Sequence, residues 1–184
     1  TKGVVHCDVK PGNVMIDRGG DIFLADFGIA RHAESTVTSF SAAGTPSYMS
    51  PEQIRGDPVN AATDVYALGV MLFELLTGQR PFKGNESGTD QGGNLVNERI
   101  RYGHLHLAPP NPCLLNPNIS PQIAEVIMKA LSKNSGERFA GVQEFFVALC
   151  NGAGVNRETI PNRAVLVGIY SRSEDQNQVS NKKF

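Results

Sequence analysis

A carboxylate, an ammonium group and an amide lie close together in the stretch VVHCDVKPGN, residues 4–13. Asp8 can accept a proton, Lys10 can neutralise negative charge, and Asn13 can offer an amide oxygen to a cation. Phosphoryl transfer from a nucleotide needs these functions, because it depends on positioning the attacking hydroxyl and on balancing the charge of the phosphate oxygens. The stretch is therefore a candidate site for phosphoryl transfer.

A nucleotide bound with Mg²⁺ needs a further oxygen ligand, and Asp26 is the candidate. It begins the triplet DFG, residues 26–28, directly after an apolar segment. Because hard cations prefer carboxylate and amide oxygens, Asn13 and Asp26 together predict a magnesium site. The alternative for the first stretch is a polar turn in which Asp and Asn side chains cap the backbone.

The apolar pattern places these residues on loops between short strands. Strands are expected at residues 4–5, 13–16 and 21–26. The sequence DRGG at 17–20 predicts a hairpin turn between the last two of them. Residues 35–43 are rich in Ser, Thr and Ala and predict a loop, and GTPSYMSPEQ at 44–53 predicts an irregular segment that ends in a short helix.

The rest of the chain predicts helices, so the expected fold is mainly α with a few short β-strands. Residues 63–77 are apolar on nearly every face and end at Gly78, which is typical of a core helix buried all round. Gly69 within it predicts the close approach of another backbone. Further helices are expected at residues 121–131, 142–150 and, between long loops, near 95–102. The stretch AVLVGIY at 164–170 predicts a strand or an interaction segment.

Composition excludes some classes of partner. The chain has 184 residues, 40% of them hydrophobic, and 17 Lys plus Arg against 18 Asp plus Glu, with no block of like charge that would favour nucleic acid or a membrane surface. Its three cysteines are far apart, which favours free thiols and a reducing compartment. The longest apolar run, residues 65–76, is too short to cross a bilayer, and the N-terminus has no signal-peptide pattern. A cytoplasmic location is expected.

Several motifs in order resemble the protein kinase family. They are HCDVKPGN at 6–13, DFG at 26–28, SPE at 50–52, DVYALG at 64–69 and ALSKNSGERF at 130–139. In that family these segments are the catalytic loop, the magnesium loop, the end of the activation segment, the start of the central helix and a segment with a buried arginine. The resemblance therefore covers most of the chain and supports the chemistry expected from the residues.

The resemblance implies a role for each matched residue. Asp8 would accept the proton of the attacking hydroxyl, and Lys10 would steady the phosphoryl oxygens and so contact both substrate and ATP. Asn13 and Asp26 would bind Mg²⁺, and Met15 would form the floor of the adenine pocket.

Other matched residues have structural roles in that family. Asp64 would accept backbone hydrogen bonds from the catalytic loop, and Glu52 would pair with Arg138. His6 and Phe27 would stack between the catalytic and magnesium loops.

Lys10 before Pro11, together with Thr45, is similar to the serine/threonine branch, and Thr45 joins Asp8 and Lys10 as a catalytic residue. The segment from GTPSYMSPEQ to LLTGQRPF is similar to that of bacterial, receptor-like kinases. The implied activity is transfer of the γ-phosphoryl group of ATP to Ser or Thr hydroxyls of a protein substrate.

Two departures from the family pattern matter. Cys7 replaces the arginine that receives an activation-loop phosphate, so control through Thr36, Thr38, Ser39 or Ser41 is not expected. The chain also shows no glycine-rich loop, strand lysine or partner glutamate, so residues 1–150 are expected to be a C-lobe without its N-lobe, followed by a flexible tail at 151–184. Such a fragment would be inactive alone and expose an apolar patch, covered by an N-lobe or a partner protein.

Two alternative functions fit parts of the pattern. A truncated kinase could act as a non-catalytic interaction module. A small-molecule phosphotransferase of the aminoglycoside type shares the aspartate, asparagine and magnesium-aspartate layout, but GTPSYMSPEQ resembles a platform for a protein substrate and counts against it.

Overall fold

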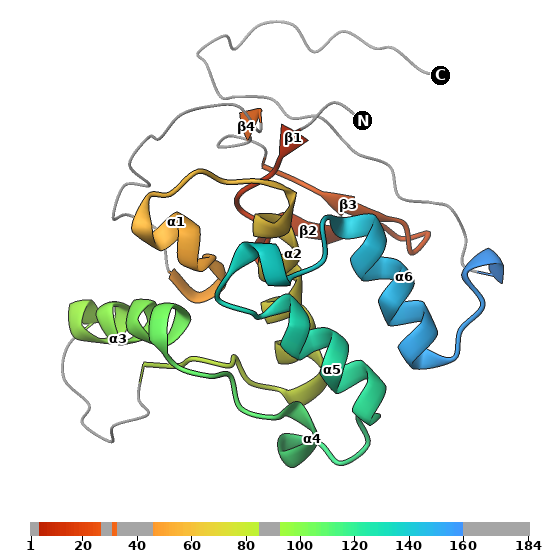
Figure 1. Cartoon of the computed structure of the whole chain (residues 1–184). Coiled ribbons are helices and arrows are strands. Elements are labelled where there is room, and N and C mark those ends of the chain that lie inside the picture. Colours follow the sequence, from red (N-terminus) through yellow and green to blue (C-terminus); the bar gives the residue numbers. More distant parts are fainter. Residues whose placement is uncertain (1–3, 27–30, 33–45, 85–92, 160–184) are drawn as a thin grey trace, which may run out of the picture.

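The computed structural model describes residues 4–26, 31–32, 46–84 and 93–159, and it is mainly helical with a few short strands (Figure 1). This confirms the predicted fold class. The helices are α1 (Pro51–Arg55), α2 (Ala61–Thr77), α3 (Gly93–His106), α4 (Pro112–Leu115), α5 (Pro121–Ala130) and α6 (Val142–Ala153). The strands are β1 (Val4–Val5), β2 (Val14–Ile16), β3 (Ile22–Leu24) and β4 (Arg31–His32), and 3₁₀ turns are η1 (Pro11–Asn13), η2 (Pro46–Tyr48), η3 (Ser135–Glu137) and η4 (Arg157–Thr159).

The predicted hairpin is β2 paired antiparallel with β3, with Val14 opposite Leu24. Its turn is closed by the Asp17 side chain, whose Oδ1 accepts from the backbone of Gly19 at 2.8 Å and of Asp21 at 2.9 Å. An aspartate that binds backbone amides ahead of it favours a turn at this point. The other strand predicted, β1, pairs with β4, a strand that the apolar pattern did not predict.

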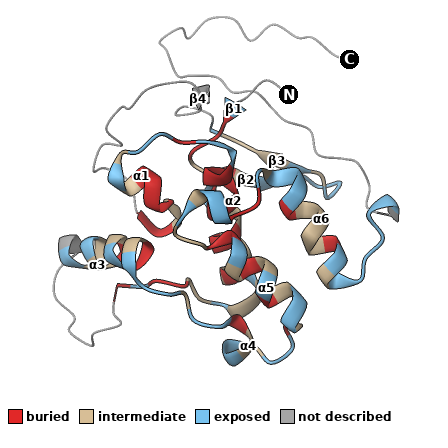
Figure 2. Cartoon of the chain, in the orientation of Figure 1, coloured by how far each residue is buried: buried red, intermediate tan, exposed pale blue. Residues whose placement is uncertain are grey.

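Helix α2 is the centre of the fold, as predicted (Figure 1). It begins two residues earlier than expected, because the Asn60 side chain caps the N–H of Ala62, and it ends at Gly78 in the left-handed conformation. Helices α5 and α6 pack against it and against each other, and α4, β1 and η2 also contact it. Buried residues concentrate along α2 and on the facing sides of its neighbours (Figure 2).

The core beside α2 forms two clusters. One joins Tyr66, Val70 and Phe73 of α2 to Ile127 and Leu131, and the other joins Val65 and Ala130 to Phe139 and Phe145. The prediction of burial all round holds for the first turns of α2 only, because Leu75 near its end is 73% exposed.

Gly69 permits a close contact between α2 and α5. A Cβ added at this glycine would lie 2.9 Å from the Cβ of Ala130 and 3.6 Å from its carbonyl carbon. The predicted close approach of another backbone is therefore confirmed, and a small residue on each helix makes it possible.

The short helix α1 is attached to the rest of the core by a buried ion pair. Arg138 donates from Nη1 to Glu52 Oε1 at 2.7 Å and from Nη2 to Oε2 at 2.9 Å, which confirms the expected pairing. The Thr63 hydroxyl donates to the same Oε1 at 2.8 Å. Burial alone would raise the pKa of Glu52, but the hydrogen bonds and charge of Arg138 hold it below its usual range.

Some of the remaining predicted elements lie within the described residues and can be compared with the structure, and others lie outside them. Helices α3, α5 and α6 agree with the predicted helices, whereas α4 forms in a region where loops were expected. The loop predicted at 35–43 and the segment at 164–170 lie outside the described residues. Within the residues that the structure describes, no helix has the length and apolar character needed to span a membrane.

Replacing Gly69 by Ala should lower stability, although Ala favours a helix by about 1 kcal/mol over Gly. The added methyl group would meet Ala130 at 2.9 Å, so α5 would have to shift. The double variant Gly69→Ala/Ala130→Gly should recover much of the lost melting temperature because it moves the methyl group across the interface. A Gly69→Ala variant as stable as the parent would contradict this account of the packing.

Removing Arg138 should be far more costly than removing an exposed arginine. Arg138→Ala leaves Glu52 buried without its partner and should lower the free energy of unfolding by about 3–5 kcal/mol. The control is Arg55→Ala, whose exposed pair with Asp57 at 3.8 Å should contribute no more than about 1 kcal/mol.

The difference in free energy of unfolding between Arg138→Ala and Arg55→Ala should depend on pH. Because the folded pKa of Glu52 lies below the ordinary value of 4.5, the stabilisation by the pair is complete above that value and is lost as the pH falls through the folded pKa. Urea unfolding at several pH values would measure this, and equal losses for the two arginine variants at pH 7 would refute the buried pair.

Candidate active site

The loop between β1 and η1 is held in an unusual backbone conformation. Cys7 has φ of 65°, a left-handed value that costs a residue with a side chain roughly 1–2 kcal/mol. Asp64, in the first turn of α2, accepts from the N–H groups of His6 at 2.8 Å and of Cys7 at 2.9 Å. The predicted anchoring of this loop by Asp64 is thus confirmed.

Burial raises the pKa of the Asp64 carboxyl, and the two backbone donors oppose that rise. The Cys7 side chain points inward as well, where it forms a buried cluster with Val5 and Val59. The residue that replaces the expected arginine therefore packs in the core beneath the loop.

Asp8, Lys10 and Asn13 form one hydrogen-bonded group. The Oδ2 atom of Asp8 accepts from Lys10 Nζ at 2.7 Å and from Asn13 Nδ2 at 2.9 Å. The same amide nitrogen donates to the Asp8 carbonyl at 2.7 Å, so Oδ1 is the remaining polar atom of the Asn13 side chain. The ammonium and the carboxylate are partly exposed, whereas Asn13 is buried.

His6 connects this loop to the end of β3. Its Nδ1 accepts from the backbone N–H of Asp8 at 3.2 Å, and its Nε2 lies 3.2 Å from the carbonyl oxygen of Ala25. A backbone N–H only donates and a carbonyl only accepts, so the ring carries its proton on Nε2. The predicted link between the two loops is present through this ring, while Phe27 lies outside the described residues.

Asp26 is placed next to Asn13 by the register of the hairpin. The N–H of Ala25 donates to the carbonyl of Asn13 at 2.7 Å, which extends the β2–β3 pairing by one residue on each strand. Asp26 follows at once, is exposed, and has φ of 62°. The structure therefore brings the three predicted oxygen-bearing residues, Asp8, Asn13 and Asp26, to one end of the hairpin.

The donor set at this end suits a hard cation. It consists of a carboxylate on Asp26 and an amide oxygen on Asn13, which are ligands that Mg²⁺ accepts together with water and phosphate oxygens. Among the described residues there is no group of three or more His, Cys, Asp or Glu side chains that could enclose a metal ion.

Met15 and Thr45 are the remaining predicted site residues. Met15 on β2 is 53% exposed, and on the opposite face of the hairpin Ile16, at 69%, pairs with Ile22, at 55%, so apolar side chains are exposed on both faces. Thr45 lies outside the described residues.

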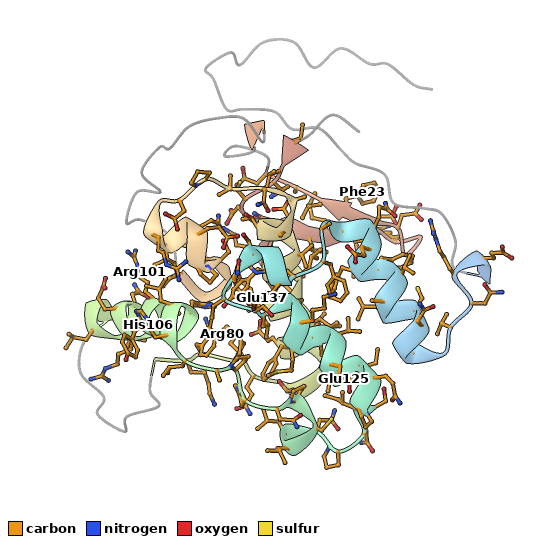
Figure 3. All side chains as sticks on the ribbon, viewed as in Figure 1. Phe23, Arg80, Arg101, His106, Glu125 and Glu137 are labelled. Carbon is orange, nitrogen blue, oxygen red and sulfur yellow. The ribbon has the colours of Figure 1, made fainter. Side chains whose placement is uncertain are left out.

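Sequence reasoning missed the side chains that hold η2, the turn directly after Thr45. Tyr48 donates its hydroxyl proton to Glu74, Arg80 donates from Nη1 to the Ser47 hydroxyl, and Arg80 Nε lies 3.9 Å from Glu74. Arg80 lies just after the end of α2 (Figure 3). Burial, together with the Glu74 carboxylate, raises the pKa of Tyr48 to about 12.

Helix α3, which contacts η2, also carries a buried histidine. The ring of His104 on α3 bonds to the Tyr66 hydroxyl through Nδ1 at 2.8 Å and packs against Phe82. Burial and the nearby Lys133 charge lower the pKa of His104 to about 3, so its ring is neutral at physiological pH. Since these partners are 26 to 38 residues apart in the chain, no local pattern could have identified them.

Comparison with known proteins identifies the family of the chain. Residues 1–147 match the family described as protein kinase domain. The chain is 38% identical over 146 residues to serine/threonine-protein kinase PknB of Mycolicibacterium smegmatis, covering 77% of this chain and 22% of that protein.

Two further relatives are similar. A probable serine/threonine-protein kinase of Streptomyces coelicolor, SCO3848, is 37% identical over 79% of this chain and 21% of its own length. A probable serine/threonine-protein kinase PknB of Lactococcus lactis is 33% identical over 84% of this chain and 23% of its own. The chain thus spans about a fifth of the length of these relatives. Since the family match covers residues 1–147 of 184, the chain belongs to the protein kinase domain family.

Proposed function

We propose that this chain supplies the catalytic loop, the magnesium ligands and part of the substrate platform of a serine/threonine protein kinase. The reaction is transfer of the γ-phosphoryl group of ATP to a Ser or Thr hydroxyl of a protein. The observation that carries the proposal is the hydrogen-bonded group of Asp8, Lys10 and Asn13 beside Asp26 at one end of the hairpin.

In this proposal Asp8 orients the attacking hydroxyl and accepts its proton. Lys10, 2.7 Å from that carboxylate, is close enough to balance the charge that develops on the phosphoryl oxygens. Asn13 holds the Asp8 side chain and its carbonyl at the same time, so the carboxylate presents a defined oxygen to the substrate. Positioning of this kind is the main contribution of a protein to phosphoryl transfer.

Protein kinases use ATP with a divalent cation, and the site offers ligands for both. Asn13 and Asp26 would hold Mg²⁺, whose chemistry when bound is to neutralise charge on the phosphate oxygens. Met15, exposed on β2, would contact the adenine ring.

The segment that contains Thr45 and η2 would receive the protein substrate. The bonds of Tyr48 and Ser47 to the end of α2 and to Arg80 support a rigid platform at this place. Thr45, directly before η2, would contact Asp8 or Lys10 in the catalytic arrangement.

The proposed kinase unit covers residues 1–150, with a tail at 151–184. The three cysteines, Cys7, Cys113 and Cys150, lie far apart in the sequence, which supports a reducing compartment, and we place the domain in the cytoplasm. Because Cys7 packs against Val59 in the core, the proposed enzyme does not depend on an activation-loop phosphate bound at this position.

Binding of Mg·ATP tests the proposed metal site. Calorimetry on the wild-type protein should show binding heat that Asp26→Asn removes, because the variant loses the charged ligand. The control is Asp57→Asn, which makes the same change of charge at an exposed position after α1. Equal heats for wild type and Asp26→Asn would mean that Asp26 does not serve a magnesium site.

Phosphoryl transfer by the intact protein tests the role of Asp8 and the class of acceptor. Asp8→Asn should reduce kcat by about 10²–10⁴ while the KM for ATP stays similar, because the lost group acts on the hydroxyl. A protein acceptor should be phosphorylated and an aminoglycoside should not. Transfer to the aminoglycoside alone would favour the small-molecule phosphotransferase, and no transfer to either would favour the interaction module.

A further inference from the structure

The peptide unit between Cys7 and Asp8 is bonded at both of its polar ends. Its carbonyl oxygen, on Cys7, accepts from Gln53 Nε2 at 2.7 Å. Its N–H, on Asp8, donates to His6 Nδ1 at 3.2 Å. A peptide plane with both ends bonded cannot rotate without breaking one of these bonds, and its orientation determines where the Asp8 side chain begins.

Gln53 reaches this carbonyl from the first turn of α1 and is itself buried, with 3% exposure. The side-chain Oε1 of Gln53 accepts from the backbone N–H of Ser50 at 3.0 Å, and the backbone N–H of Gln53 donates to the Ser50 hydroxyl at 3.3 Å. These two bonds form the capping box of α1. One amide therefore caps the helix with its oxygen and holds the catalytic loop with its nitrogen.

The bonds form a continuous series from α1 to the magnesium loop. It runs from the Ser50 N–H through the Gln53 amide to the Cys7 carbonyl, and from the Asp8 N–H through the His6 ring to the Ala25 carbonyl. Asp8, one carboxylate of the proposed reaction, is a member of this series through its N–H, and Asp26, the other, directly follows its last member, Ala25.

We propose that Gln53 is a positioning residue for Asp8, which acts by holding the Cys7–Asp8 peptide plane at the left-handed turn of the catalytic loop. A non-glycine residue keeps such a conformation only where its surroundings determine it fully. Asp64 binds the two preceding N–H groups of the loop, and Gln53 supplies the contact to the carbonyl. The inference rests on the proposed function, in which Asp8 accepts the proton.

Gln53→Met tests the role of the amide nitrogen with a neutral side chain of similar length. The variant cannot donate to the Cys7 carbonyl, so kcat of the intact protein should fall at least about tenfold, toward the roughly hundredfold loss that a displacement of about 1 Å causes. The KM for ATP should not change, because no proposed nucleotide ligand is altered.

Gln53→Glu adds a readout that a structural role would not change. The ionised carboxylate cannot donate to the carbonyl, but the protonated acid can, and burial favours the protonated form. The ratio of its kcat to that of wild type should therefore rise as the pH is lowered from about 8 to about 6, whereas the ratio for Gln53→Met should stay constant. His6, Asp8 and Asp64, the ionisable residues around this contact, are present in wild type and in every variant, so the ratio isolates the effect of the side chain at position 53.

Ser50→Ala separates positioning from helix capping. It removes the hydroxyl that caps α1 and leaves the donor of Gln53 to the Cys7 carbonyl in place. The melting temperature should fall while kcat is retained. A loss of kcat in Ser50→Ala equal to that in Gln53→Met, or no loss in Gln53→Met, would overturn the proposal and leave Gln53 as a capping residue.

Amide hydrogen exchange without nucleotide tests the same contact independently of activity. Exchange at Cys7 and Asp8 should be faster in Gln53→Met than in wild type, and unchanged in the control Gln143→Met, where an exposed glutamine of α6 is replaced. Unchanged exchange in Gln53→Met would overturn the proposal. If exchange is faster in Gln53→Met but the wild-type protein transfers no phosphoryl group, only the proposed function is overturned. The contact of Gln53 would then still hold the loop, but the loop would not carry out phosphoryl transfer.

Discussion

The candidate site depends on the hydrogen bonds that the Asp64 carboxylate accepts. It lies in the first turn of α2 and accepts from two successive N–H groups of the loop that carries Asp8. Those bonds stabilise the left-handed backbone at Cys7, which turns the chain so that Asp8, Lys10 and Asn13 face one another. A buried carboxylate without donors would be costly, so the loop and the helix stabilise each other.

The same turn of α2 also binds α1 and the segment that follows α5. The carbonyl of Ala62 accepts from Arg138 at 3.0 Å, and the hydroxyl of Thr63 donates to Glu52. Consecutive residues of one helical turn thus bind α1, the segment after α5 and the catalytic loop. The core beneath fixes the position of this turn, because Tyr66, Val70 and Phe73 pack against Ile127 of α5 and Val65 packs in one cluster with Phe145 of α6.

Much of the fold was predictable because its signals are local. The apolar periodicity of α5 and α6, the Asp17 turn of the hairpin and the Gly78 end of α2 are each set by residues within a few positions of one another. Helix α4 was missed because its four residues in a Pro- and Asn-rich region are too few to show a period, and β4 because its two residues form a strand only by pairing with β1. The contacts between Glu52 and Arg138 and between Asp64 and the loop were expected from the family resemblance, since spacing alone could not pair residues 86 or 58 positions apart.

The sequence alone determined the types of residue available for chemistry and the elements on which they lie: Asp8, Lys10 and Asn13 in one loop, Asp26 at the end of a strand, and an apolar helix to support them. Only the tertiary structure decided how these groups are oriented. Gln53 and Asp64 lie 46 and 57 residues from Cys7, yet they bind its carbonyl and its N–H. The physical reason is that a left-handed turn at a non-glycine residue is unfavourable by itself, so its conformation is set by partners that only folding brings within hydrogen-bonding distance.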